Sequence, residues 1–160
     1  MRKIFLVGAA GFATGLLAVG LAWAAGDLTS QSPVDVTVEL GSADGQLRFH
    51  PADLTFETGK LYRLSLHNPS PRPHYFTAPG FAARVFTRKV QTMSGRGPDA
   101  KAMAEVKGTI REVEVHPGGT LEWWFVPIAT VVNEPVICGI KDPDGKTHVE
   151  KGMVGSITLK

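Results

Sequence analysis

The sequence predicts an all-β domain, a Greek-key β-sandwich or barrel of seven to eight short strands with a short helical insertion. Apolar and polar residues alternate with a period of two in several segments, and turn residues separate these segments at short intervals. The chain has 160 residues, of which 43% are hydrophobic and 20% are charged. This composition is typical of a single globular domain with an ordinary core.

The first 25 residues have the features of an export signal. Arg2 and Lys3 give a positive start, an apolar run covers residues 4–23, and Ala22-Trp23-Ala24 has the small-x-small pattern of a cleavage site. The apolar run is also long enough to span a bilayer. The segment is therefore either a cleaved signal peptide or a retained membrane anchor.

We divide the chain into a signal peptide at 1–25, a linker at 26–33 and a domain at 34–160. The formal charge of +2 falls to zero without Arg2 and Lys3, because the 15 remaining basic residues balance 15 acidic ones. A near-neutral domain gives no electrostatic reason to expect nucleic-acid binding. Export predicts a periplasmic location, with membrane attachment only if residues 4–23 are retained.

The first strands are predicted between residues 34 and 68. Residues 34–40 alternate, with four apolar side chains on one face and three polar ones on the other. Asp44-Gly45 and Thr58-Gly59 are turn signals. Further strands are expected at 46–49, 54–57 and 60–68.

The next segment, 68–73, is rich in proline, which cannot donate a hydrogen bond to a sheet. It is therefore a loop, and it places His74 at the start of a strand over 75–77. Residues 81–107 have few β-branched runs, and 98–105 are expected to form one or two helical turns. Strand patterns return at 110–115, 120–126, 131–138 and 155–159.

Cys138 is the only cysteine. Thiols outside the cytoplasm are usually paired in disulfides, yet Cys138 has no partner within its own chain. It is therefore an intermolecular bridge, a buried inert thiol or a ligand, and the cysteine count does not choose among these.

Four residues supply two imidazoles, one thiolate and one thioether: His74, Cys138, His148 and Met153. A trigonal set of two histidines and a cysteine with a weak axial methionine is the arrangement of electron-transfer copper sites. Each residue also has a structural alternative. His74 and His148 could be ordinary loop histidines, and Cys138 and Met153 could be packed in the core.

Three segments resemble the cupredoxin family, which includes plastocyanin and azurin. Residues 47–62 resemble its amino-terminal strands, and Asn68 followed by His74-Tyr75-Phe76 resembles its N…H-x-F segment. Cys138…His148-x4-Met153-Val154-Gly155-Ser156-Ile157 resembles its closing C…H-x4-M-x-G-x-I segment. This resemblance covers 34–160 and implies a blue copper protein with one copper ion, with His74, Cys138 and His148 as equatorial ligands and Met153 as the axial one.

Nine residues separate Cys138 from His148, a longer loop than in many small cupredoxins and one that resembles the loop of copper nitrite reductases. Ile137 stands where the catalytic copper of those reductases takes a histidine, so we do not expect an enzyme. The segment between Cys138 and Met153 is also unusually charged, which favours an electrostatic encounter with a partner; its charged residues are Lys141, Asp142, Asp144, Lys146, Glu150 and Lys151.

These features predict an exported single-electron carrier that cycles one copper ion between Cu(I) and Cu(II). Its expected partner is a c-type cytochrome or a membrane or periplasmic oxidoreductase. Two alternatives are a periplasmic copper chaperone or resistance protein, and a degenerate cupredoxin domain with a structural role.

Overall fold

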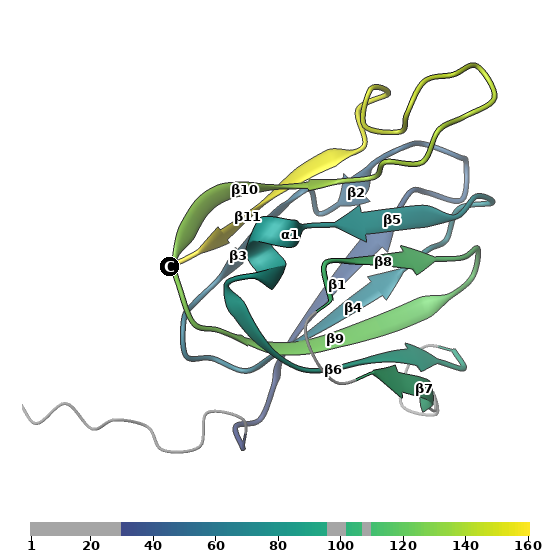
Figure 1. Ribbon diagram of the computed structural model, residues 1–160. Helices are drawn as coiled ribbons and strands as arrows, with labels where there is room; N and C mark the ends of the chain where they lie inside the picture. Colours follow the sequence, from purple (N-terminus) through teal and green to yellow (C-terminus); the bar gives the residue numbers. More distant parts are fainter. Residues whose placement is uncertain (1–29, 96–101, 107–109) are drawn as a thin grey trace, which may run out of the picture.

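A computed structural model describes residues 30–95, 102–106 and 110–160. The predicted signal peptide at 1–25 lies outside these residues. Within them the chain forms two β-sheets and one short helix, α1 (Pro79–Ala82) (Figure 1). The described residues contain no helix with the length and apolar character needed to cross a membrane.

One sheet has six strands in the order β2-β1-β4-β9-β6-β7, and the other has five in the order β3-β11-β10-β5-β8. The pairs β1–β4 and β3–β11 are parallel, and the remaining neighbours are antiparallel. The strands are β1 (Val34–Leu40), β2 (Phe49–His50), β3 (Asp53–Phe56), β4 (Tyr62–His67), β5 (His74–Thr77), β6 (Val85–Met93), β7 (Ala102–Val106), β8 (Glu112–Val115), β9 (Thr120–Pro127), β10 (Val131–Ile137) and β11 (Val154–Leu159).

The core lies between the two sheets because alternate residues of their strands point inward. In β4, Tyr62, Leu64 and Leu66 are buried while the residues between them are partly exposed. At the centre, the ring of Phe81 packs edge-on against Phe125 with centroids 4.9 Å apart, and against Trp123 at 5.3 Å. The all-β, two-sheet prediction is confirmed.

The helix predicted at 98–105 is wrong for the part that the structure describes. Residues 102–105 belong to β7, which pairs with β6, and residues 98–101 lie outside the described part of the chain. The local sequence is rich in alanine and favours a helix. The edge of β6 offers unpaired main-chain groups, however, and pairing with them outweighs that modest local preference.

The sequence pattern predicts neither β6 nor β7 as a strand. β6 has polar residues at several inward and outward positions, yet it pairs along nearly its whole length with β9, from Val85↔Pro127 to Met93↔Thr120. Its strand conformation is therefore set by a neighbour that the local pattern does not reveal.

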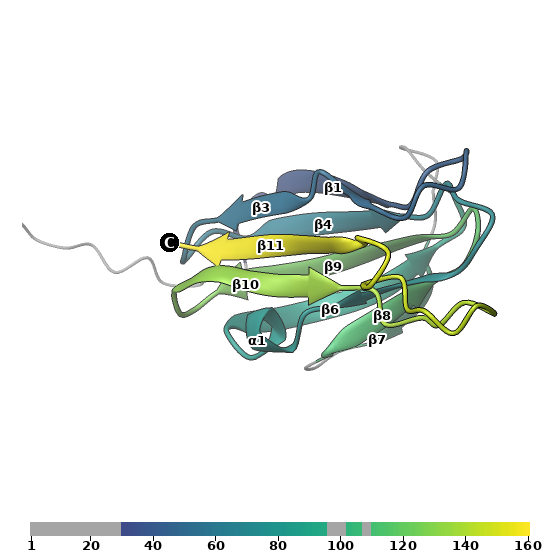
Figure 2. The ribbon, with the colours of Figure 1, turned by 90° about the horizontal axis from the view of Figure 1, so that it is seen from above.

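The sandwich has two distinct ends (Figures 1 and 2). The C-terminus and α1 lie toward one end. At the other end β5 begins, β10 finishes and β11 begins, and a long loop between β10 and β11 projects from the body. The predicted metal donors all fall in segments at this second end.

Candidate metal centre

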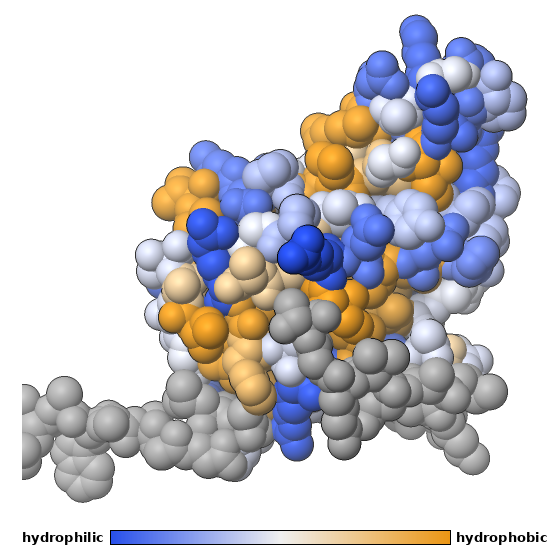
Figure 3. Space-filling model, in the orientation of Figure 1, coloured by the Kyte–Doolittle hydropathy of each residue, from blue (hydrophilic) through white to orange (hydrophobic). Residues whose placement is uncertain are grey.

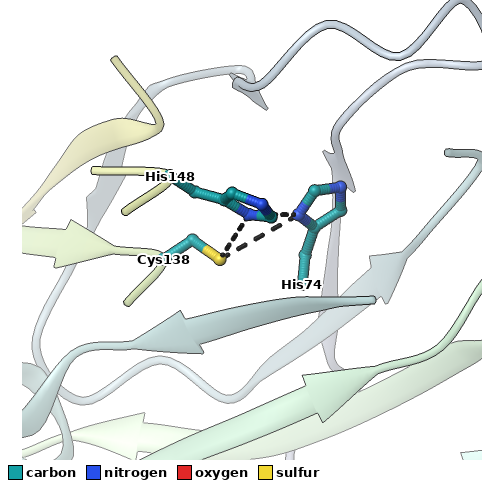
Figure 4. A group of neighbouring side chains, drawn as sticks. All are labelled: His74, Cys138 and His148. Carbon is teal, nitrogen blue, oxygen red and sulfur yellow. Dashed lines mark hydrogen bonds between the residues drawn. The ribbon is translucent and has the colours of Figure 1, made fainter. Parts of the chain in front are cut away.

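Three of the four predicted donors meet in a buried group (Figure 4). The Sγ of Cys138 lies 3.3 Å from Nδ1 of His148 and 3.9 Å from Nδ1 of His74, and the two Nδ1 atoms are 3.2 Å apart. All three side chains belong to residues with no exposed surface. His74 approaches from the start of β5, whereas Cys138 and His148 lie at the two sides of the long loop.

His74 is held by the proline-rich loop that precedes it. The side chain of Asn68 fixes this loop, since its Nδ2 donates to the carbonyl oxygens of Arg72 and Val115 at 2.7 and 2.6 Å, and its Oδ1 accepts from the backbone N–H of Ser70. The Nε2 of His74 lies 2.8 Å from Oγ of Ser70. The Asn68 of the sequence motif therefore positions the histidine through the loop between them.

The hydrogen bonds of Ser70 assign the tautomer of His74. The Ser70 hydroxyl donates its one hydrogen to the carbonyl of Arg72 at 3.0 Å. It must therefore accept from His74, which places the ring hydrogen on Nε2 and a lone pair on Nδ1. Burial, together with the nearby charges of His148 and Arg72, lowers the pKa of His74 to about 4. The ring is thus neutral near pH 7 and can donate its lone pair.

Cys138 immediately follows β10 and lies beneath the backbone of β5. Its Sγ accepts a hydrogen bond from the backbone N–H of Tyr75 at 3.3 Å. Burial raises the pKa of the Cys138 thiol. A metal that binds this sulfur must therefore displace a proton, which makes its affinity dependent on pH.

The nine residues between Cys138 and His148 fold back on themselves, so the length of this loop does not keep His148 away from Cys138. Lys141 and Thr147 form an antiparallel bridge, and the backbone N–H of Asp142 donates to the carbonyl of Lys146 at 2.8 Å. The turn is made by Asp142-Pro143-Asp144-Gly145, with Gly145 at φ 84°. Such a sequence is itself a turn signal. The chain returns to Cys138, whose carbonyl accepts from the N–H of Val149.

A single helical turn then separates His148 from Met153. Thr147 and Glu150 form a reciprocal cap, because Glu150 accepts from the N–H of Thr147 at 2.6 Å and Thr147 Oγ1 accepts from the N–H of Glu150 at 3.2 Å. At the other end, Gly152 has φ 95°, and the N–H of Met153 donates to the carbonyl of His148 at 2.8 Å. This is a glycine-terminated turn, and it accounts for the H-x4-M spacing.

Met153 is fully buried beside the other donors. Its carbonyl accepts from the N–H of Cys138 at 3.3 Å, so the two residues are tied through the main chain. Ligation of a metal by its sulfur stays a prediction.

The outer nitrogen of His148 is also occupied. Its Nε2 lies 3.3 Å from Oδ1 of Asp142, and that carboxylate is paired with Arg72 and Lys151. Salt bridges and hydrogen bonds, led by that of Lys151, lower the pKa of Asp142 to about 2. The charges of Asp142 and Lys151 are evident in the sequence but this contact is not, because Asp142 reaches His148 only through the turn of the five residues between them. The loop that carries them forms a hydrophilic projection from the body (Figure 3).

The donor set suits copper. An ionised carboxylate only accepts hydrogen bonds, so Nε2 of His148 carries a hydrogen, and in the neutral ring its Nδ1 then presents a lone pair. Two imidazole lone pairs and a sulfur thus point at one another, and the group could hold a metal ion. Two imidazoles and a thiolate are typical of mononuclear copper sites, whereas structural zinc sites favour several cysteines.

The fold has known counterparts, although no family model and no curated protein sequence matches the chain. A multicopper oxidase from Campylobacter jejuni superposes with a TM-score of 0.57 at 14% identity, over 82% of this chain and 31% of that one. A multicopper oxidase from Pediococcus acidilactici gives 0.54 at 13% identity, over 82% and 27%. The chain thus spans less than a third of the length of either protein.

A smaller protein, auracyanin from Roseiflexus castenholzii, is also similar. It superposes with a TM-score of 0.46 at 16% identity, over 81% of this chain and 99% of that one. The identities are low, and the likeness to the two oxidases concerns the arrangement of strands. Together with the two-sheet topology, it shows that this chain contains a domain of cupredoxin-like fold.

Proposed function

We propose that the domain binds one copper ion through His74, Cys138 and His148, with Met153 as a weak axial ligand, and carries single electrons. The observation that supports this most directly is the convergence of two imidazole lone pairs and one sulfur in a buried group. Lone pairs that face one another repel, and a cation between them converts that repulsion into binding.

The surroundings of the donors suit electron transfer. Each equatorial donor is held by a hydrogen bond from outside the group: His74 by Ser70, His148 by Asp142 and Cys138 by the N–H of Tyr75. Partners of this kind fix the orientation of metal ligands. A held geometry would change little between Cu(I) and Cu(II), and the potential would be tuned by Met153 and by the groups around the cysteine sulfur.

In this proposal the domain is not itself an enzyme and makes or breaks no bonds. The export signal predicted at 1–25 supports a periplasmic location, and a retained segment at 4–23 would attach the domain to a membrane. Its redox partner would be a c-type cytochrome or a membrane or periplasmic oxidoreductase, with no nucleic acid involved.

The test is an absorption and EPR spectrum of the copper-loaded protein. A blue or green Cu(II) form with an intense thiolate charge-transfer band is expected, and Cys138→Ser should lose that band. A colourless Cu(II) form would overturn the proposal. If Cys138→Ser retained its full copper content with an unchanged spectrum, the domain would instead be a degenerate one with a structural role.

One observation favours a second candidate, a copper chaperone or resistance protein. The ring of His148 is covered by Asp142 and its ion pairs rather than open to solvent. A covered ligand suits storage or delivery of Cu(I), because close contact with an electron-exchange partner is hindered. Stopped-flow reoxidation by cytochrome c separates the two functions: a carrier exchanges electrons rapidly, whereas a chaperone binds Cu(I) tightly and exchanges electrons slowly.

A further inference from the structure

One carboxylate links all the segments that carry the predicted ligands. Oδ1 of Asp142 lies 3.3 Å from Nε2 of His148 and 3.0 Å from Nη1 of Arg72, and Oδ2 lies 2.6 Å from Nζ of Lys151. Arg72 is two residues before His74, and Lys151 is two residues before Met153. The ion pairs of Asp142 with Arg72 and Lys151 therefore join these segments to one another.

The backbone holds Asp142 in this place. It begins the turn of the folded loop, where its N–H donates to the carbonyl of Lys146 and its own carbonyl accepts from the N–H of Gly145 at 2.9 Å. Its side chain is only 10% exposed. The carboxylate is therefore fixed by the turn on one side and by two cations on the other, and it is directed at the ring of His148.

We propose that Asp142 is a positioning residue, whose carboxylate fixes His148 in the tautomer that presents Nδ1 to His74 and Cys138, and whose ion pairs hold the folded loop closed over that ring. The consequence for copper rests on the proposed function, whereas the tautomer is a property of the protein without metal.

The two histidines then differ in strength as ligands. His74 donates its Nε2 hydrogen to a neutral hydroxyl, and His148 donates its Nε2 hydrogen to a carboxylate. A carboxylate partner makes an imidazole the more basic and better oriented ligand. Because a more basic donor favours Cu(II) over Cu(I), Asp142 lowers the reduction potential of the centre and strengthens the binding of Cu(II).

The chain supplies a matched control. Asp144 lies in the same turn and pairs with Lys151 at 2.8 Å, as Asp142 does, but the structure gives it no contact with His148. The substitutions Asp142→Asn and Asp144→Asn each remove one negative charge from the same loop with little change in volume. Only the first removes a charged acceptor from the imidazole.

The first experiment is ¹⁵N NMR of the imidazoles in the full metal-free protein at neutral pH. The wild type and Asp144→Asn should show His148 as the single tautomer protonated at Nε2, and Asp142→Asn should show a mixture of tautomers. The proposal would be overturned if His148 of the wild type were protonated at Nδ1. It would also be overturned if the spectrum of Asp142→Asn were identical to that of the wild type. The wild-type measurement needs no variant, so the proposal is decided even if Asp142→Asn does not fold.

The second experiment measures Cu(II) affinity by competition and the reduction potential. Asp142→Asn should bind Cu(II) about 10–100-fold more weakly, the usual effect of losing such a partner, and should have a higher potential, while Asp144→Asn stays close to the wild type. Equal changes in both variants would show a general charge effect and contradict the proposal. If the wild type took up no copper at all, the proposed function would fail, and the NMR result would still decide the role of Asp142.

Discussion

Gly41 leaves no space for a side chain beside His74. A Cβ built on Gly41 would lie 2.6 Å from Nε2 of His74 and 2.8 Å from Cβ of Ser70, and the residue has φ 73°. The loop after β1 therefore passes directly over the hydrogen bond that assigns the tautomer of His74.

Replacing Gly41 by alanine should destabilise the protein and displace His74 from the other donors. The left-handed backbone alone costs an alanine about 1–2 kcal/mol, and the contact with the imidazole adds to this. Chemical denaturation and the Cu(II) EPR spectrum measure the two effects. Gly45→Ala is the control, because Gly45 has φ 84° and no neighbour within 4 Å of a built Cβ. An equal loss of stability in both variants, with an unchanged EPR spectrum, would contradict the prediction.

Gly155 has a comparable role at the start of β11. Its Cβ would lie 2.3 Å from the carbonyl oxygen of Ala52, beside the hydrogen bond that this oxygen accepts from the N–H of Ser156. Gly155→Ala should therefore separate the β2–β3 connection from β11 and lower the midpoint of thermal unfolding.

The control for this change is Gly139→Ala, since a Cβ on Gly139 meets nothing within 4 Å. We expect that variant to unfold close to the wild-type temperature. If the two alanine variants were equally stable, the close approach of Ala52 would not be what requires glycine at position 155.

Met153→Leu tests whether the methionine is a ligand or only part of the core. Leucine fills a similar volume, so the metal-free variant should lose less than about 1.5 kcal/mol. If the sulfur binds copper, the reduction potential and the Cu(II) EPR parameters should nevertheless change, because the axial ligand tunes both. Unchanged spectra and potential in a well-folded variant would assign Met153 to packing alone.

The stability of the metal-free protein should fall as the pH is lowered from about 6.5 to about 4. Burial lowers the pKa of His74 from 6.5 to about 4, so between these values the unfolded chain binds a proton that the folded chain does not. Stability then increases with pH across this window. The loss is at most about 3.5 kcal/mol, at roughly 1.4 kcal/mol for each pKa unit.

Urea denaturation between pH 4 and pH 8 measures this effect. The pKa of Asp142 is lowered from 3.8 to about 2, so the stability that this carboxylate contributes is lost only as the pH falls from 3.8 to about 2. That pH range lies below the range in which His74 acts. Equal stability at pH 5 and pH 7 in the wild type would contradict the prediction.

The sequence by itself determined most of the strands and the identity of the predicted donors. Period-two alternation places Tyr62, Leu64 and Leu66 on one buried face of β4, because successive side chains of a strand point to opposite sides. Residue type limits the donors to the one cysteine and to histidines and methionines, and the resemblance to the cupredoxin motifs selects His74, His148 and Met153 among these.

Tertiary structure decided what depends on contacts between distant segments. β7 is a strand because β6 offers an open edge, although its own residues favour a helix. His74 meets Cys138 across 64 residues only because β5 and β10 are neighbours in one sheet. The tautomers of both histidines depend on Ser70 and Asp142, whose roles require a hydrogen-bond geometry that no sequence pattern contains. Local sequence encodes local periodicity and chemistry, whereas a centre built from the start of β5 and the loop between β10 and β11 exists only after the sheet has brought these two segments together.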